Sequence, residues 1–211
     1  MKFKTILVFA MMLLLLVGCH PDNSTDIGDS DDTYTPPALD TEATYYADID
    51  IADYGVIIIQ LDQAVAPVTC ANFVELAESG FYDGLTFHRI IAGFMMQGGD
   101  PAGNGTGGSD NNIVGEFESN GHKNDLKHVL GVISMARTND PNSGSSQFFL
   151  CVDNCHHLDK NYAGFGKMTD EESIKVLKEL NSYPTGMIDY SLQDWPNTDI
   201  KNYTIKSIYR A

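Results

Sequence analysis

The sequence has few positive charges, few cysteines and a single tryptophan, and we find no internal repeat in it. Only 13 of the 211 residues are Lys or Arg, against 29 Asp and Glu, so the formal net charge is −16 at pH 7. A chain with this balance repels phosphate backbones and anionic lipid headgroups. We therefore expect neither nucleic acid nor an anionic lipid surface as a partner.

The small number of cysteines limits the metal and disulfide chemistry that the chain can support. Of the four, Cys70, Cys151 and Cys155 lie beyond the N-terminal region. His156 and His157 follow Cys155 and suggest a metal site, but the spacing is not that of a zinc knuckle and no second ligand pair follows. A disulfide between Cys151 and Cys155, or two free thiols, are the better interpretations. We expect no metal and no cofactor.

The only long apolar run lies at the N-terminus. Two lysines precede an apolar stretch from Ile6 to Val17, which is short for a membrane span and has the length of the apolar region of a signal peptide. The stretch ends in Leu16-Val17-Gly18-Cys19, which resembles a bacterial lipobox; an ordinary signal peptide with an incidental cysteine is the alternative. We expect residues 1–18 to be removed and Cys19 to be lipidated. The protein would then be anchored on the extracytoplasmic side of a membrane in the bacterial cell envelope.

Residues 19–44 differ in composition from the rest of the chain. They are rich in Asp, Ser, Thr, Asn and Gly, and Pro36-Pro37 follows. Such a segment has no apolar face to bury, so we predict an acidic, disordered tether. The remaining residues, 45–211, are enough for one domain with a real core.

The domain shows many short strands and two helices in an order that does not alternate. Pro67 suits the first turn of a helix that ends near Gly80, and a second helix begins near Asp170. This order argues against a βαβ sheet and favours a closed antiparallel barrel with a helix at each end. The predicted strands are Tyr54–Leu61, Leu85–Met96, Val129–Met135, Gln147–Val152, Ala163–Lys167 and Tyr203–Tyr209.

One segment places a single guanidinium in an almost uncharged run. The segment is Phe87-His88-Arg89-Ile90-Ile91-Ala92-Gly93-Phe94-Met95-Met96-Gln97-Gly98-Gly99-Asp100. Burying an unpaired charge costs several kcal/mol, so Arg89 is an unusual residue for a core strand. Its presence is explained if the strand faces an apolar groove where a fixed cation meets a polar, uncharged substrate. The alternative is a structural arginine paired with Glu116 or Glu118.

Together with Ser145-Ser146-Gln147-Phe148-Phe149-Leu150, this segment resembles the cyclophilin family of peptidyl-prolyl cis-trans isomerases. Two separated motifs in the right order are more specific than either one alone. The resemblance implies a mainly β domain, an eight-stranded barrel capped by two helices. It also implies an enzyme that accelerates X–Pro bond rotation in proteins folding in the cell envelope, with proline-containing polypeptides as partners. We expect a monomer.

This reaction needs no nucleophile, metal or proton relay. Rotation breaks the amide resonance against a barrier of about 20 kcal/mol and returns a lone pair to the proline nitrogen. A catalyst needs a donor for that nitrogen, a dry pocket for the proline ring and anchors for the flanking peptide. The resemblance gives these catalytic roles to Arg89, Phe94 and Gln97.

The resemblance also implies a set of substrate-binding residues, although core packing is the alternative for any unplaced Phe or Met. His157 stands where many members have Trp, so we expect weak cyclosporin binding with intact activity. Tyr162 stands where other members of the family have His. Arg137 stands where Asn is common, but the family uses only the backbone of that residue. The predicted substrate-binding residues are Met95, Gly105, Ala136, Arg137, Thr138, Gln147, Phe149, His157, Leu158 and Tyr162.

Two other functions fit parts of the sequence. A chaperone or scaffold could bind proline-containing peptides with little turnover, and an envelope protein could bind metal through Cys151, Cys155 and His157. The segment Pro184–Asn202, which contains Trp195, matches no motif, and we assign it no function.

Overall fold

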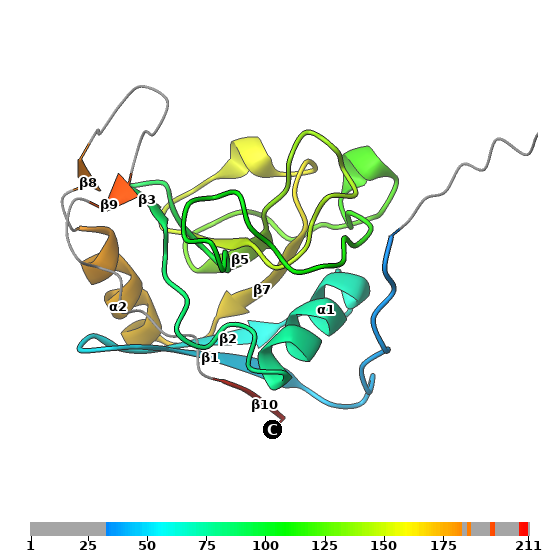
Figure 1. Cartoon of the computed structure of the whole chain (residues 1–211), viewed down its shortest axis with the longest axis horizontal. Coiled ribbons are helices and arrows are strands. Elements are labelled where there is room, and N and C mark those ends of the chain that lie inside the picture. Colours follow the sequence, from blue (N-terminus) through cyan, green and yellow to red (C-terminus); the bar gives the residue numbers. More distant parts are fainter. Residues whose placement is uncertain (1–32, 183–184, 187–194, 197–206, 211) are drawn as a thin grey trace, which may run out of the picture. The chain divides into compact units, whose positions relative to one another are not determined.

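The computed structural model describes residues 33–182, 185–186, 195–196 and 207–210. One sheet has the strand order β10-β1-β2-β7-β5-β6-β4-β3 with antiparallel neighbours, and β8 pairs with β9 separately (Figure 1). The strands are β1 (Tyr45–Ile51), β2 (Gly55–Leu61), β3 (Arg89–Ile91), β4 (Met95–Gly98), β5 (Val132–Met135), β6 (Phe148–Cys151), β7 (Gly164–Met168), β8 (Thr185–Gly186), β9 (Trp195–Pro196) and β10 (Ser207–Arg210). The helices are α1 (Pro67–Glu78) and α2 (Glu171–Asn181), with 3-10 turns η1 (Glu118–Asn120) and η2 (His156–Leu158).

The sheet is open, which corrects the predicted closed eight-stranded barrel. Strands β1 to β7 form a half-barrel, and β10 extends one edge by pairing with β1. Among the described residues no ladder joins the end strands β10 and β3. The end strand β3 is only three residues long. It lies close to β9, which pairs with β8 and not with β3. The mainly β antiparallel architecture with two helices is confirmed.

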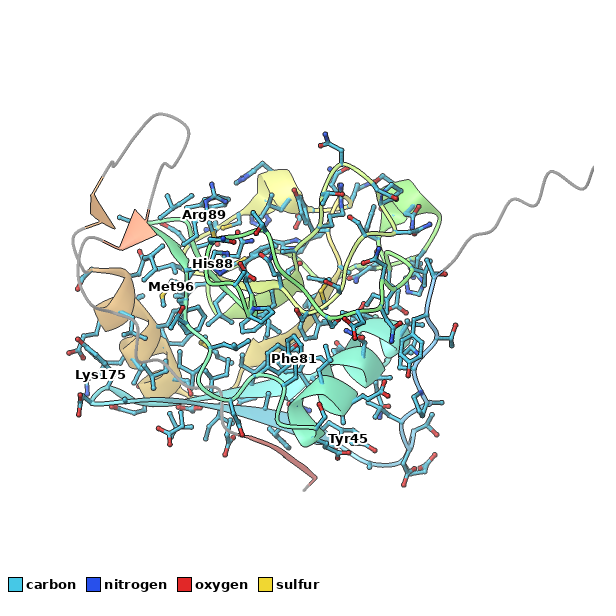
Figure 2. All side chains as sticks on the ribbon, in the orientation of Figure 1. Tyr45, Phe81, His88, Arg89, Met96 and Lys175 are labelled. Carbon is cyan, nitrogen blue, oxygen red and sulfur yellow. The ribbon has the colours of Figure 1, made fainter. Side chains whose placement is uncertain are left out.

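Alternation along β6 divides the apolar side chains between the two faces of the sheet. Phe148 and Leu150 belong to the main core, whereas Phe149 and Cys151 belong to a smaller apolar cluster. The same alternation on β4 sends Met96, which is labelled in Figure 2, into the main core, and Met95 to the smaller cluster. The smaller cluster therefore marks the face of the sheet on which the candidate site is built.

Carboxylates fix the beginnings of both helices. At α1 the buried Glu116 accepts hydrogen bonds from the backbone N–H groups of Val68 and Thr69, at 3.0 and 2.7 Å. At α2 the Asp170 carboxylate accepts from the N–H of Ser173 at 2.8 Å. A negative charge at a helix N-terminus satisfies unpaired donors and interacts favourably with the helix dipole. Both helices begin where the sequence predicts them.

The end of the predicted tether is packed against the domain, in contrast to the expectation for residues 19–44. The N–H of Tyr34 donates to the carbonyl of Asn112 at 2.6 Å, and Leu39 packs against the main core. The folded unit accordingly starts near Asp32 rather than at Tyr45. Residues 1–32, including Cys19, lie outside the described part of the chain. Within the described part, no helix has the length and apolar character needed to cross a membrane.

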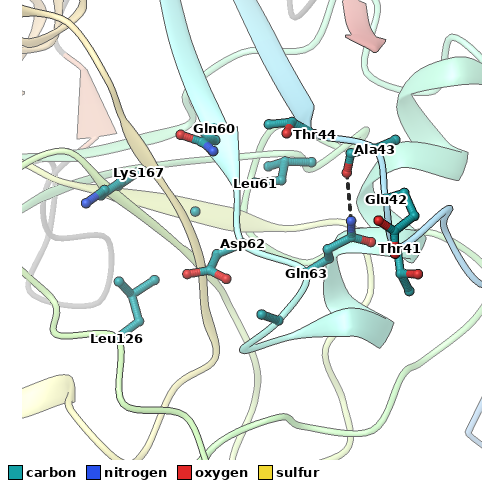
Figure 3. Close-up of a pocket in the computed structure, with 12 residues that line it drawn as sticks. Thr41, Glu42, Ala43, Thr44, Gln60, Leu61, Asp62, Gln63, Leu126 and Lys167 are labelled. Carbon is teal, nitrogen blue, oxygen red and sulfur yellow. Dashed lines mark hydrogen bonds between the residues drawn. The ribbon is translucent and has the colours of Figure 1, made fainter. Parts of the chain in front are cut away.

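A cavity of about 480 Å³ lies between this N-terminal segment and the ends of β2 and β7 (Figure 3). Its lining includes Asp62 and Lys167, and beside them Gln63 Nε2 donates to the carbonyl of Ala43 at 2.8 Å. None of the predicted site residues lines this cavity. It is therefore separate from the candidate site.

Candidate functional site

Strand register brings the two sequence motifs together. Arg89 on β3 pairs with Gln97 on β4, Gln97 pairs with Phe149 on β6, and Phe149 pairs with Ser134 on β5. Directly paired residues of an antiparallel sheet place their side chains on the same face. These four residues therefore form one row across the sheet, on the face of the smaller apolar cluster.

A pocket of about 280 Å³ opens on this row. Phe149 and Met95 are 6% and 3% exposed, so its floor is apolar and largely dry. The ring of Tyr162 meets that of Phe149 edge-on, with centroids 5.7 Å apart. Every lining residue is among those that the sequence predicts for the site: Arg89, Phe94, Met95, Gln97, Ala136, Arg137, Phe149, Leu158 and Tyr162.

A second cavity, of about 160 Å³, adjoins the first. Gln97, Ala136 and Arg137 line both cavities. Three further predicted residues, Gly105, Thr138 and Gln147, line the second cavity alone. The two cavities therefore share a wall, and together they form the groove of the candidate site.

His157 is the one predicted binding residue that lines neither cavity. It lies exposed on η2, and its ring is tilted against that of Phe94, with centroids 5.2 Å apart. It therefore stands outside the pocket, behind Phe94. The weak cyclosporin binding expected from His157 stays a prediction.

Arg89 has no carboxylate partner among the described residues. Its Nη1 donates to Gln97 Oε1 over a long distance of 3.5 Å, and the side chain is half-buried (Figure 2). Glu116 accepts hydrogen bonds from the backbone at the start of α1, and Glu118 forms an ion pair with Lys160 at 2.9 Å. Neither glutamate therefore pairs with Arg89, so the alternative of a structural Arg89–glutamate pair is wrong, and no carboxylate of the described residues engages its guanidinium.

A chain of amide groups continues from Arg89 along the groove. Gln97 Nε2 donates to Gln147 Oε1 at 2.8 Å, and Gln147 Nε2 donates to the carbonyl oxygens of Gly107 at 2.6 Å and Gly105 at 3.2 Å. Each side chain in this hydrogen-bonded series is oriented by the next one. The arrangement holds Gln97 in one position, where its amide can hydrogen-bond a peptide backbone.

Asp100, which the sequence reasoning missed, organises the glycine-rich loop. Its carboxylate accepts from the N–H groups of Ala102 at 2.8 Å, Asn104 at 2.9 Å and Gly105. Burial acts to raise the pKa of Asp100, but these three donors and the nearby His88 outweigh it, so the pKa lies below its usual range. The signal was present, because an Asp at the start of a Gly- and Asn-rich stretch commonly bonds the backbone that follows.

His128 is a second residue that the sequence reasoning missed. It is buried beneath Phe149, where its Nε2 lies 2.9 Å from Ser134 Oγ and its Nδ1 lies 3.1 Å from Asp159 Oδ1. Burial lowers the pKa of His128 although Asp159 opposes this, so the ring is neutral at pH 7. With its Nδ1–H donated to Asp159, Nε2 accepts from the Ser134 hydroxyl.

Cys70, Cys151 and Cys155 are free thiols in this structure, which for Cys151 and Cys155 is one of the two interpretations left open by the sequence. Cys151 and Cys155 are buried in the smaller apolar cluster, and the Cys155 thiol donates to the carbonyl of Phe94 at 3.4 Å. His156 Nδ1 lies 3.1 Å from Asp159, away from the thiols. No group of three metal-ligating side chains occurs among the described residues, so the alternative of a metal site here gains no support.

Comparison with known proteins relates the chain to one family. The family model described as "Cyclophilin type peptidyl-prolyl cis-trans isomerase/CLD" matches residues 46–207. A peptidyl-prolyl cis-trans isomerase of Synechococcus elongatus is 48% identical over 128 residues, which cover 61% of this chain and 83% of the relative. One from Helicobacter pylori strain J99 is 44% identical over 148 residues, which cover 70% of this chain and 88% of the relative.

Solved structures agree with the sequence comparisons. The crystal structure of a Cryptosporidium parvum cyclophilin type peptidyl-prolyl cis-trans isomerase matches with a TM-score of 0.66 and 31% identity, covering 80% of this chain and 98% of its own. A second structure of that protein, determined in the presence of the dipeptide Ala-Pro, matches with a TM-score of 0.65 and 32% identity. It covers 79% of this chain and 98% of its own.

Proposed function

The chain belongs to the cyclophilin-type peptidyl-prolyl cis-trans isomerases and is an enzyme of that type, and we propose that Arg89 is the group that assists rotation of the X–Pro bond. One observation carries this proposal: among the described residues Arg89 has no carboxylate partner, and it lies beside Gln97 at an apolar pocket. As the bond rotates, a lone pair develops on the proline nitrogen. A guanidinium N–H can donate to that lone pair without any transfer of a proton.

Arg89 supplies only part of the acceleration. A hydrogen bond to a charged group contributes about 1.5–3 kcal/mol, which corresponds to roughly a tenfold to hundredfold change in rate. Transfer of the amide into the dry pocket over Met95 and Phe149 supplies a further part of the acceleration, because removal of water favours the less polar, twisted amide. Gln97 holds the flanking backbone and Phe94 covers the ring, so that only one side of the bond rotates.

Proline-containing polypeptides are the substrates that this pocket fits. The walls of Phe94, Met95, Phe149, Leu158 and Tyr162 present apolar and aromatic surface to a pyrrolidine ring. The related Cryptosporidium parvum isomerase was crystallised in the presence of Ala-Pro, which supports the same ligand chemistry here.

We propose further that the enzyme acts in the bacterial cell envelope, anchored through a lipid on Cys19, on proteins that fold there. The proposal rests on the apolar stretch from Ile6 to Val17 and on Gly18-Cys19 that follows it. Metabolic labelling with a tagged fatty acid should mark the wild type and not Cys19→Ala, and the variant should leave the membrane fraction. Equal labelling of both proteins would contradict the proposal.

We also propose that the protein is a monomer. Light scattering on the protein without its lipid tests this.

Exchange NMR on a peptide with a single X–Pro bond tests the role of Arg89. Arg89→Ala should lower turnover by about tenfold or more while the peptide still binds. Lys178→Ala, which removes an exposed cation from α2, is the matched control and should keep wild-type turnover. If the wild type binds the peptide without accelerating exchange, the chaperone or scaffold alternative replaces the enzyme.

A further inference from the structure

Arg137 lies where the two cavities of the site meet, and its guanidinium is fixed in place. Nε and Nη2 donate to the carbonyl of Asn161 at 3.1 and 2.9 Å, and Nη1 donates to the carbonyl of Thr138 at 2.8 Å. An arginine side chain has five N–H groups, so within the described residues two remain for a ligand.

Two aromatic rings pack against the guanidinium of Arg137. The central carbon of the guanidinium lies 5.0 Å from the ring centroid of Phe117 and 4.7 Å from that of Tyr162. Tyr162 in turn packs edge-on against Phe149 on the floor of the pocket. Because Arg137 is already ordered, a ligand that binds it does not have to immobilise a long, flexible side chain.

The groove carries positive charge on a strongly acidic protein. The charged residues that line the two cavities are Arg89 and Arg137, and no carboxylate is among the lining residues of either cavity. Of the acids on neighbouring segments, Glu118 pairs with Lys160 and Asp159 lies 3.8 Å from Lys127, while the exposed Asp140 carboxylate accepts from the N–H of Asn142. At physiological salt, charges more than about 8 Å away are largely screened, so the local cations determine the field that a bound peptide meets.

We propose that Arg137 determines specificity by favouring peptides that carry an acidic side chain close to the isomerised proline. The inference rests on the proposed function, because it assumes that the proline ring occupies the cavity of about 280 Å³ beside Phe149. A neighbouring residue of the peptide then lies at the cavity of about 160 Å³, which Arg137 also lines. A carboxylate has two oxygens that can accept both remaining N–H groups of the guanidinium, whereas a neutral amide offers one oxygen and no charge.

Matched peptides test this inference. Each has one X–Pro bond, and Glu is compared with Gln at single positions up to three residues before or after the proline. For each pair, exchange NMR gives the turnover ratio and calorimetry gives the affinity ratio. At the best position the wild type should favour Glu by about threefold to tenfold, and this preference should shrink as salt is added.

Three variants separate the charge of Arg137 from its packing. Arg137→Gln should bring the Glu/Gln ratios close to one, whereas Arg137→Lys, which keeps the charge, should retain part of the preference. Lys178→Gln removes one exposed cation of α2 that lines neither cavity of the site, and it should keep the wild-type ratios. The same ratios in wild type and Arg137→Gln, or no preference in the wild type, would show that Arg137 only braces Tyr162 and overturn the inference. If the wild type turns over neither peptide, the role proposed for the site fails, and the affinity ratios still decide the role of Arg137.

Discussion

The ring of His128 lies nearly parallel to that of Phe149, with centroids 6.1 Å apart and planes inclined by 19°. His128 supports the floor of the pocket from below and joins it, through Asp159, to the segment that carries Leu158. Burial lowers the pKa of His128 more than Asp159 raises it, so protonation of the ring is disfavoured in the folded protein. We therefore expect the support of the pocket floor to respond to acid.

We predict that stability falls below about pH 6.5 and that His128 causes part of the loss. Burial lowers the pKa of His128 in the folded protein, while the unfolded chain takes up a proton near its ordinary value of about 6.5. The stabilisation is complete above that pH and is lost as the pH falls toward the folded-state pKa. Urea unfolding at pH 8, 7, 6 and 5.5 should show this slope in the wild type and a weaker one in His128→Asn.

His156→Asn is the control for that experiment, because the exposed His156 contacts the same Asp159 carboxylate at 3.1 Å. It should leave the slope almost unchanged. Some slope should also persist in His128→Asn, since burial and Arg89 lower the pKa of His88 although Asp100 opposes them. An identical slope in wild type and His128→Asn would contradict the assignment.

Arg89→Lys should behave almost like Arg89→Ala in turnover. Lys keeps the positive charge but lacks the planar fork that lets one N–H meet Gln97 while another meets the proline nitrogen. We expect turnover to fall by about tenfold or more, with peptide affinity changed only a few-fold. Exchange NMR gives both quantities. Turnover close to the wild type would mean that charge alone suffices.

Local patterns predicted the helices and most strands because each signal lies within a few residues. Pro67 marks the start of α1 and Asp170 the start of α2. Strand β1 was missed although Tyr45–Ile51 alternates buried and partly exposed positions, since its two Asp residues resemble the acidic segment before it. Its burial comes from pairing with β2, which a local pattern does not reveal.

The open edge of the sheet and the support of the site could not be predicted in the same way. Closure depends on whether β3 meets β10, two strands far apart in the chain, and no residue in either one encodes the answer. The contact between His128 and Phe149 likewise joins residues that only the ladder of β5 and β6 brings together. Arg89 and Gln97 were predicted from the resemblance of their motif to a known family. The segment Leu85–Met96 was predicted as one strand, whereas the structure has the hairpin of β3 and β4, which places Arg89 opposite Gln97.

Asp100→Asn should weaken both the fold and substrate binding. The amide keeps one acceptor oxygen, so N–H groups of the glycine-rich loop lose their partner, at a cost of about 1–3 kcal/mol in the free energy of unfolding. The loop carries Gly105 and Gly107, whose carbonyls orient Gln147, so KM should rise several-fold and kcat should change less. Steady-state kinetics and urea unfolding measure the two effects. Asp110→Asn, an exposed carboxylate in the same loop, should change neither, and a normal KM in Asp100→Asn would contradict the role of Asp100.

The thiols should be unreactive in the native protein and free in the unfolded one. Burial raises the pKa of Cys70, Cys151 and Cys155, so almost no thiolate is present at pH 7.5, and the thiolate is the form that attacks disulfide reagents. Ellman's reagent should therefore react slowly with the folded protein. In denaturant it should react fully with these three thiols, and also with Cys19 where that residue carries no lipid.

A denatured, non-reduced sample in which two of the three thiols fail to react would establish the Cys151–Cys155 disulfide instead. Such a disulfide would engage the sulfur that now donates to the carbonyl of Phe94, and so would reach the wall of the proline pocket.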